Sequence, residues 1–169
     1  MPTIIDGSLG ITFPVTAGSA SAVQASSGRV LQVVQGVLTG GSQSTTSSTF
    51  IDTNLTASIT PSNSSNKIFV IVEQSGCSKQ VGNTGFNLRL QRNSTTIQII
   101  TDAGFYNGGT TDSRFNIVST CYLDSPSTTS SVTYKTQFAN YNNGVGSAYV
   151  NDYGTTQVTS TITLMEIAA

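Results

Sequence analysis

Phe86-Asn87-Leu88-Arg89-Leu90-Gln91 is the stretch of sequence that decides the fold. Phe86, Leu88 and Leu90 alternate with polar residues, so apolar and polar side chains point to opposite sides of an extended chain. A period of two residues is typical of an antiparallel strand with one buried face. Residues 114–123 show the same alternation with apolar residues on both sides, which predicts a strand covered by a second sheet or by another subunit.

Further stretches rich in β-branched residues also predict strands. They are residues 28–38, 50–59, 67–75, 96–101, 131–141, 148–151 and 158–166. Segments rich in Pro, Gly, Asn and Ser separate them, as expected for turns, and helical periodicity is almost absent. The predicted fold class is therefore all-β, an antiparallel β-sandwich or jelly roll of about eight to ten strands. The Ser- and Thr-rich run from Gly40 to Thr49 is expected to be an exposed loop.

The first 28 residues differ from the rest of the 169-residue chain. They are mostly small, with few apolar side chains, and such a segment cannot bury a core of its own. We expect residues 1–28 to form an extended N-terminal arm and residues 29–169 to form one head domain. The arm is either a flexible tail or a segment that becomes ordered against a partner protein. Five apolar side chains would then dock: Ile4, Ile5, Leu9, Ile11 and Phe13.

The composition excludes several classes of function. Charged residues make up only 9% of the chain, the net charge is −1, and the polarity comes from 72 Ser, Thr, Asn and Gln residues. The seven Lys and Arg residues are scattered, which argues against a nucleic-acid interface and against an anionic-lipid patch. The chain has no His, the commonest general base near neutral pH and the commonest zinc ligand. We therefore expect no enzyme activity, no cofactor and no metal ion.

The acidic and cysteine residues support no catalytic or metal motif. A glycosidase needs two carboxylates roughly 5–10 Å apart, but Asp102, Asp112, Asp124 and Asp152 lie beside turn residues, where Asp commonly hydrogen-bonds its own backbone. No calcium-loop pattern surrounds Asp102, Asp112 or Asp152. Cys77 and Cys121 are either two small apolar side chains on neighbouring strands or a disulfide pair.

The beginning of the chain lacks the basic-then-apolar pattern of a signal peptide. The longest uninterrupted apolar stretch, Ile68 to Val72, is far too short to cross a membrane as a helix. We expect neither a signal peptide nor membrane insertion.

Several stretches, taken in order, resemble the small jelly-roll heads of bacteriophage tail-fibre and related virion proteins. They are Gly10–Pro14, Gly28–Gln35, Ser58–Ser62 with Lys67–Val70, Leu123–Thr129 and Ser160–Glu166. The resemblance extends over about residues 10–169. It implies a sandwich of eight to ten strands, similar to tumour-necrosis-factor-type heads, that packs as a homotrimer and displays loops at its distal end. It also implies a virion component that is assembled in the host cytoplasm, and it transfers no catalytic residue to this chain.

A head that binds a host receptor is expected to use aromatic residues in loops, with neutral polar neighbours. A sugar, for example, offers hydroxyls to hydrogen-bond and apolar ring faces to stack on. Residues 105–114, 140–144 and 151–154 have this composition, although a Tyr at a strand end also serves simply as packing. The predicted receptor contacts are Tyr106, Asn107, Arg114, Tyr141, Asn143 and Tyr153.

Three hypotheses of function follow. The first is a non-enzymatic phage virion protein, a trimeric tail-fibre head or adhesin that contacts a host-surface glycan or protein through distal loops while residues 1–28 bind other virion proteins. The second is an architectural capsid decoration or tail-attached protein without a receptor. The third, a secreted bacterial lectin-like module, is disfavoured by the missing signal peptide.

Overall fold

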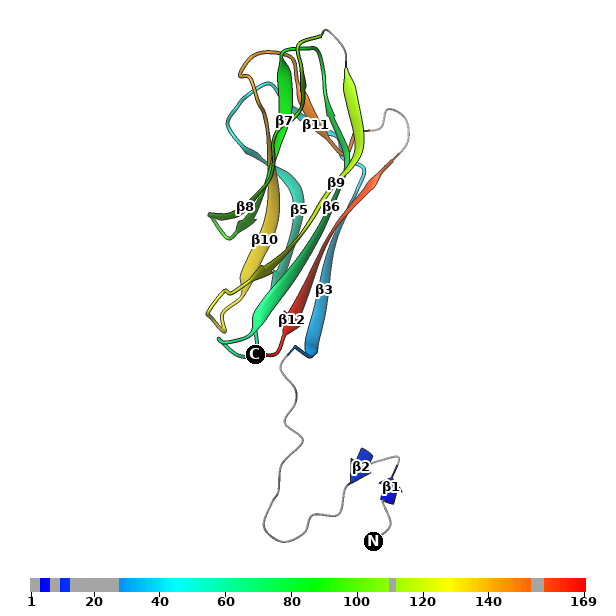
Figure 1. Ribbon diagram of the computed structural model, residues 1–169, viewed down its shortest axis with the longest axis vertical. Coiled ribbons are helices and arrows are strands. Elements are labelled where there is room, and N and C mark those ends of the chain that lie inside the picture. The colour runs from blue at the N-terminus through cyan, green and yellow to red at the C-terminus, as the bar shows by residue number, and fades with distance from the viewer. Residues whose placement is uncertain (1–3, 7–9, 13–27, 110–111, 153–156) are drawn as a thin grey trace.

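The computed structural model of the chain describes residues 4–6, 10–12, 28–109, 112–152 and 157–169. The strands β3 to β12 form two antiparallel sheets that face each other (Figure 1). Two short strands of the N-terminal segment, β1 (Ile4–Asp6) and β2 (Gly10–Thr12), pair as an antiparallel hairpin. No helix occurs in the described ranges. The prediction of an all-β sandwich is confirmed.

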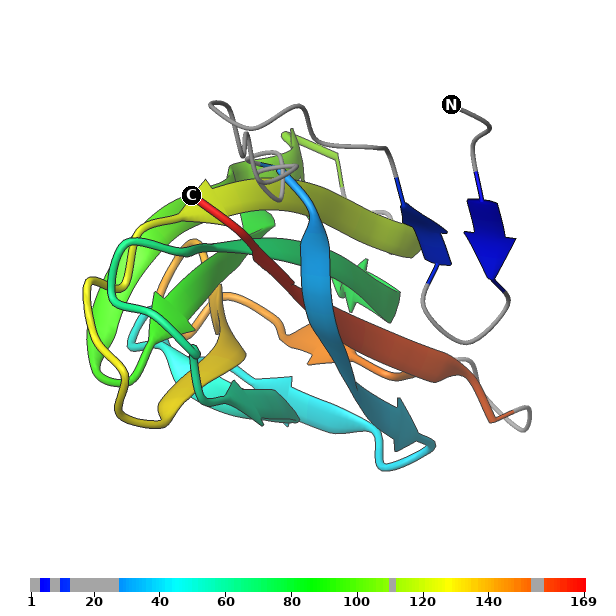
Figure 2. The ribbon, with the colours of Figure 1, turned by 90° about the horizontal axis from the view of Figure 1, so that it is seen from below.

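The smaller sheet contains four strands in the order β5 (Ile51–Ile59), β10 (Val132–Asn140), β7 (Thr84–Arg92) and β8 (Thr95–Asn107). The larger sheet contains β3 (Val30–Thr39), β12 (Thr159–Ile167), β6 (Lys67–Lys79), β11 (Ala148–Val150) and β4 (Gln43–Thr45). A further strand, β9 (Ser113–Asp124), pairs with the opposite edge of β6. Figure 2 shows β3 and β12 running together across the larger sheet.

Every strand expected in the head is present, with shifted ends. The loop prediction for residues 40–49 was wrong in part, because Gln43–Thr45 forms β4 and pairs with β11. The period-two pattern misses β4 because its three residues are all polar and because its partner strand lies about a hundred residues away in sequence. Strand β8 continues to Asn107, so Tyr106 and Asn107 lie at a strand end and not in a loop.

Alternate side chains of the facing strands fill the core in two clusters. One cluster lies, in space, at the end of the sandwich where the chain ends, and it contains Leu55, Ala57, Ile59, Ile68, Val70, Val72, Leu90, Val132, Tyr134, Ile162 and Leu164. The other cluster contains Cys77, Phe86, Leu88, Phe138, Ala148 and Val150. Phe86, Leu88 and Leu90 are completely buried, as the alternation in this stretch predicts.

A layer of hydrogen-bonded polar side chains lies between the two clusters. Gln74 on β6 is completely buried, and its Oε1 accepts a hydrogen bond from Thr136 Oγ1 on β10 at 2.9 Å. Its Nε2 donates to Ser160 Oγ on β12 at 3.0 Å and to Asn151 Oδ1 at 3.2 Å. Thr136 Oγ1 also lies 2.6 Å from Thr53 Oγ1 on β5. The layer thus connects the two sheets directly.

Strand β9 has apolar side chains on both sides, as its sequence predicts. Val118 and Tyr122 pack inward against the core clusters. Ile117 and Leu123 point outward, with 58% and 55% of their surface exposed. Among the residues that the structure describes, no second sheet covers that outward side, as the exposure of Ile117 and Leu123 shows.

The two cysteines lie on neighbouring strands and are not bonded. Cys77 is buried on β6, and Cys121 is exposed on β9; both are free thiols. Burial raises the pKa of Cys77 to about 12. The disulfide alternative is therefore excluded.

Glu166 ties the C-terminal strand to the turn between β5 and β6. Its completely buried carboxylate accepts hydrogen bonds from Ser62 N and Ser62 Oγ, both at 2.7 Å, and from Asn66 Nδ2 and Gln32 Nε2, both at 2.6 Å. Burial raises the pKa of Glu166, but these donors outweigh it and lower the pKa to about 2.

We expect the stability of the head to fall as the pH falls from about 4.5 towards 2. The folded-state pKa of Glu166 is depressed, so the ionised carboxylate stabilises the fold above its unfolded pKa, and this contribution is lost on protonation. Glu166→Gln should unfold with a shallower pH dependence and be less stable by about 2 kcal/mol near neutral pH. Urea unfolding at several pH values measures both effects. An unchanged pH slope in Glu166→Gln would contradict the assignment, and Glu73→Gln, at an exposed carboxylate, is the control.

Candidate functional site

The two ends of the sandwich contain different parts of the chain. The amide of Gly28 donates to the carbonyl of Ala168 at 2.8 Å, so the head begins and ends at the same pole. The connections β6–β7, β8–β9 and β10–β11 lie at the opposite pole, at the top of Figure 1. We call these three connections the distal loops. Most of the predicted receptor contacts lie in or beside them.

Tyr106 and Tyr141 form an exposed aromatic pair at the distal pole. Tyr106 stands near the end of β8 and Tyr141 follows β10, and the two strands are not neighbours in the sheet. Their ring centroids are 5.8 Å apart at an interplanar angle of 74°, an edge-to-face contact. The rings remain 49% and 41% exposed. Folding therefore joins two predicted contacts into one surface that can stack on a ligand.

The buried amide of Asn140 holds the β10–β11 loop in place. Its Nδ2 lies 3.1 Å from the carbonyl oxygen of Asn142, 2.9 Å from that of Val145 and 3.1 Å from that of Gly146. Its Oδ1 accepts a hydrogen bond from Thr84 Oγ1 on β7. These hydrogen bonds fix the backbone at Asn140, and they therefore also fix the position of Tyr141, the next residue.

Two predicted contacts already make hydrogen bonds within the head. Lys79 is almost fully buried, and its Nζ donates to Asn107 Oδ1 at 2.9 Å and to the Val81 carbonyl at 2.8 Å. Burial lowers the pKa of Lys79, and the nearby carboxylate of Asp112 opposes that shift. Asn143 is exposed, and its Oδ1 accepts from the Ser48 amide at 3.3 Å. Both residues therefore help to order the distal pole.

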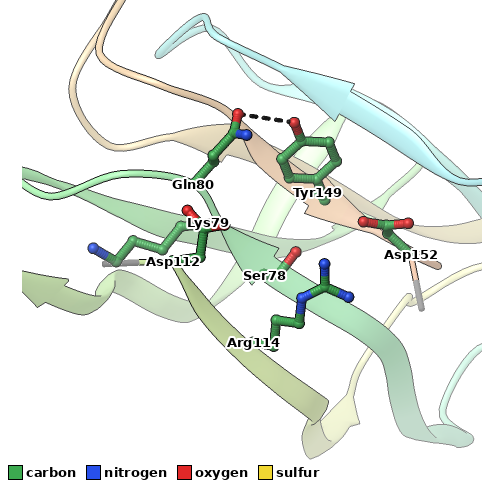
Figure 3. A pocket seen from close by; sticks show the side chains of 7 residues that line it. All are labelled: Ser78, Lys79, Gln80, Asp112, Arg114, Tyr149 and Asp152. Atoms are coloured by element: carbon green, nitrogen blue, oxygen red, sulfur yellow. Dashed lines mark hydrogen bonds between the residues drawn. The ribbon is translucent and has the colours of Figure 1, made fainter. Parts of the chain in front are cut away.

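Arg114 lines a small polar pocket between β6, β9 and β11 (Figure 3). The pocket has a volume of about 110 Å³ and is lined by Ser78, Lys79, Gln80, Asp112, Arg114, Tyr149 and Asp152. Tyr149 Oη donates to Gln80 Oε1 at 3.2 Å across one side of it. Within the described part of the chain, the guanidinium of Arg114 forms no ion pair.

Sequence patterns did not predict the rest of this pocket. Gln80 and Tyr149 lie in or beside strands with no loop motif, and only the pairing of β6 with β9 and β11 brings them next to Arg114. Asp112 and Asp152 belong to the stretches 105–114 and 151–154 that the sequence predicts as receptor contacts, but nothing in the sequence predicts that these two side chains meet. Their proximity is set by tertiary structure, so no spacing rule could have found it.

The structure does not test one predicted receptor contact and the five predicted anchoring residues of the N-terminal segment. Tyr153, Leu9 and Phe13 are outside the described residues. Ile4 and Ile5 lie on β1, and Ile11 lies on β2. Their predicted roles remain predictions.

The site offers hydrogen bonding and stacking. Among the residues that the structure describes, no three His, Cys, Asp or Glu side chains gather closely enough to hold a metal ion. The same part of the chain contains no helix that is long and apolar enough to cross a membrane.

Comparison with solved structures relates the head to a protein of virus particles. The VP2 subviral particle of infectious bursal disease virus matches 99% of this chain and 41% of the VP2 chain, with a TM-score of 0.53 and 14% sequence identity. The Gx strain of the same virus matches 100% of this chain and 45% of its own chain, with a TM-score of 0.50 and 14% identity. This chain thus spans less than half of the proteins it matches, and at such low identity the likeness shows a shared β-sandwich fold. No protein-family model and no curated protein matches the sequence.

We expect Asn140→Ala to loosen the β10–β11 loop. The change leaves the Thr84 hydroxyl and three loop carbonyls without their shared partner, and should cost about 2–3 kcal/mol of stability. Hydrogen exchange of residues 141–147 should rise more than that of β12. Val145→Ala, which shortens an exposed side chain in the same loop and keeps the backbone carbonyl that Asn140 contacts, is the control. Equal exchange in both variants would contradict the role of Asn140.

Proposed function

We propose that this chain is a non-enzymatic structural protein of a virion. Its head presents the distal loops to the host surface, while residues 1–28 attach it to other virion proteins. The observation that carries the proposal is the opposite placement of the two poles, with Gly28 at one and the exposed pair Tyr106–Tyr141 at the other. The sandwich fold shared with a protein of virus particles supports it.

A host-surface glycan fits the chemistry of the distal pole. The Tyr106 and Tyr141 rings offer apolar edges and faces on which a sugar ring can stack. Arg114 and the polar lining of its pocket offer hydrogen-bond partners for hydroxyl groups.

The finer assignment rests on the resemblance in sequence. A phage tail-fibre head would act as a homotrimer, be assembled in the host cytoplasm and reside in the virion. The two solved structures compared above come from infectious bursal disease virus, so they support a virion protein but do not extend to tail fibres or tumour-necrosis-factor-type heads. The alternative is an architectural capsid decoration or tail-attached protein, with the same fold and no receptor.

Replacing the aromatic pair should abolish binding to host cells. We expect labelled full-length protein to bind a susceptible strain within a panel of bacteria, and Tyr106→Ala with Tyr141→Ala to weaken that binding by at least about tenfold, since exposed aromatic anchors commonly dominate an interface. Ile99→Ala, which shortens an exposed apolar side chain elsewhere on β8, is the control. Undiminished binding by the double variant would exclude the aromatic pair as the contact.

Deletion of residues 1–28, combined with a measurement of cell binding, distinguishes the two virion hypotheses. An adhesin should lose incorporation into particles but keep binding to cells as an isolated head. A protein that never binds cells, yet loses incorporation on this deletion, is the architectural alternative. Normal incorporation without residues 1–28 would overturn the proposed role of the arm.

A further inference from the structure

The larger sheet turns a row of apolar side chains away from the core. Strand pairing places Val33 beside Met165, Met165 beside Phe69 and Phe69 beside Leu123, so that one row crosses β3, β12, β6 and β9. The residues before and after them on these strands point into the sandwich. The row therefore lies on the side of the sheet that faces away from β5, β10, β7 and β8.

Two parallel rows extend this surface. They contain Gln35, Thr163, Ile71 and Cys121, and then Val37, Thr161, Glu73 and Ser119. Glu73 is the only charged residue in the three rows. We call these twelve residues the outer face. Its apolar side chains fill one complete row and recur in the other two rows as Ile71, Cys121 and Val37. A surface with few charges and many apolar groups has the composition of the core of a protein interface.

The outer face is exposed in the single chain. Val33, Val37 and Leu123 are 56%, 58% and 55% exposed, whereas Phe69, Ile71 and Met165 between them are half-buried. Large apolar side chains at such exposure, gathered on one surface, are uncommon on a protein that works alone.

The edge strand β3 adds a second, independent observation. Its ten residues, VLQVVQGVLT, include no charged residue and no Pro. Exposed edges are normally protected by charges, Pro or bulges, because an unprotected edge pairs with other chains. Strand β3 has little of this protection over most of its length. Its lack of charged residues and Pro is explained if another copy covers β3 in an assembly.

We propose that the outer face is the surface through which copies of this chain contact one another. This inference rests on the proposed function and deepens it, because it names the partner and the place of contact within the assembled protein.

The area suits a contact between copies. The twelve residues of the outer face, three rows about 6.6 Å apart on four strands about 4.8 Å apart, cover roughly 400 Å². They are the central rows of the outward side of the sheet, which measures roughly 600 Å² per copy along the nine residues of β12. Contact over this whole side buries roughly 1,200 Å² from two copies, the lower end of the range for specific interfaces.

The charge pattern favours a second copy over a charged partner. A partner with a charged surface would have to bury those charges unpaired against the uncharged centre, which is costly. A second copy brings the same neutral rows, and a net charge of −1 adds little repulsion between copies.

Cys121 lies within the outer face and reports on its accessibility. For the 169-residue chain we expect sedimentation to show an oligomer, and a maleimide reagent to modify Cys121 at least about tenfold more slowly than in a monomeric variant, because thiol reactivity follows exposure. Cys77 is an internal control: it is buried with a raised pKa and should stay unmodified until the protein is unfolded.

Charge substitutions at exposed positions test the contact without disturbing the core. Val33→Glu with Leu123→Glu should convert the oligomer to a monomer and expose Cys121. Ile99→Glu is the matched control, because Ile99 is 53% exposed on β8 in the smaller sheet. It should change neither sedimentation nor labelling. An intact circular dichroism spectrum shows that each variant is folded, and Leu123→Ser provides a milder variant at the same position.

The outcomes separate this inference from the proposed function. A trimer or other oligomer with protected Cys121 supports the outer face as the contact. An oligomer in which Cys121 is labelled freely overturns it, yet leaves the virion role standing. A wild-type chain that sediments as a 17.6 kDa monomer at micromolar concentration overturns both the contact and the homotrimer. Cell binding and particle incorporation then decide the virion role separately.

Discussion

The buried amide of Gln74 is the constraint on which the rest of the structure depends. A buried amide is costly unless both its donor and its acceptor are satisfied, and the partners of Gln74 come from both sheets: Thr136 from the smaller, Ser160 from the larger. A slip of β6 by one residue would turn this side chain outward and reverse every core position of the strand. Gln74 thus sets the register on which the two core clusters and both poles depend.

Hydrogen bonds of neutral side chains connect the sheets and loops of this protein at positions where many proteins have ion pairs. Gln74 joins the sheets, Asn140 holds a distal loop, and Asn151 donates to the carbonyl oxygen of Gly40 at 2.7 Å. Charged side chains contribute at fewer places: four donors surround the Glu166 carboxylate, Lys79 donates to Asn107, and Arg92 pairs with Asp124 at 2.8 Å. The abundance of Ser, Thr, Asn and Gln is therefore a property of the interior as well as of the surface, and most of the fold does not respond to protonation near neutral pH.

The three surfaces to which we propose functions lie on different parts of the head. Gly28 and Ala168 lie at one pole, the Tyr106–Tyr141 pair lies at the other pole, and the outer face runs along the larger sheet between them. Copies in contact through the outer face would leave both poles free. An assembled head can then be attached at one end and bind at the other, which is the geometry that the proposed virion role requires.

The sequence by itself determined the strands whose alternation is local. Phe86, Leu88 and Leu90 predicted β7 because each residue reports its own side of the strand. Tertiary structure alone decided β4, whose polar residues pair with a distant strand, and the outward side of β9, because both of its sides are apolar and only the packing of Tyr122 on the core distinguishes them. The pocket around Arg114 and the contact of Tyr106 with Tyr141 likewise join residues far apart in the chain. Periodicity records which way a side chain points, but the partner it meets depends on how the sheets pair and pack.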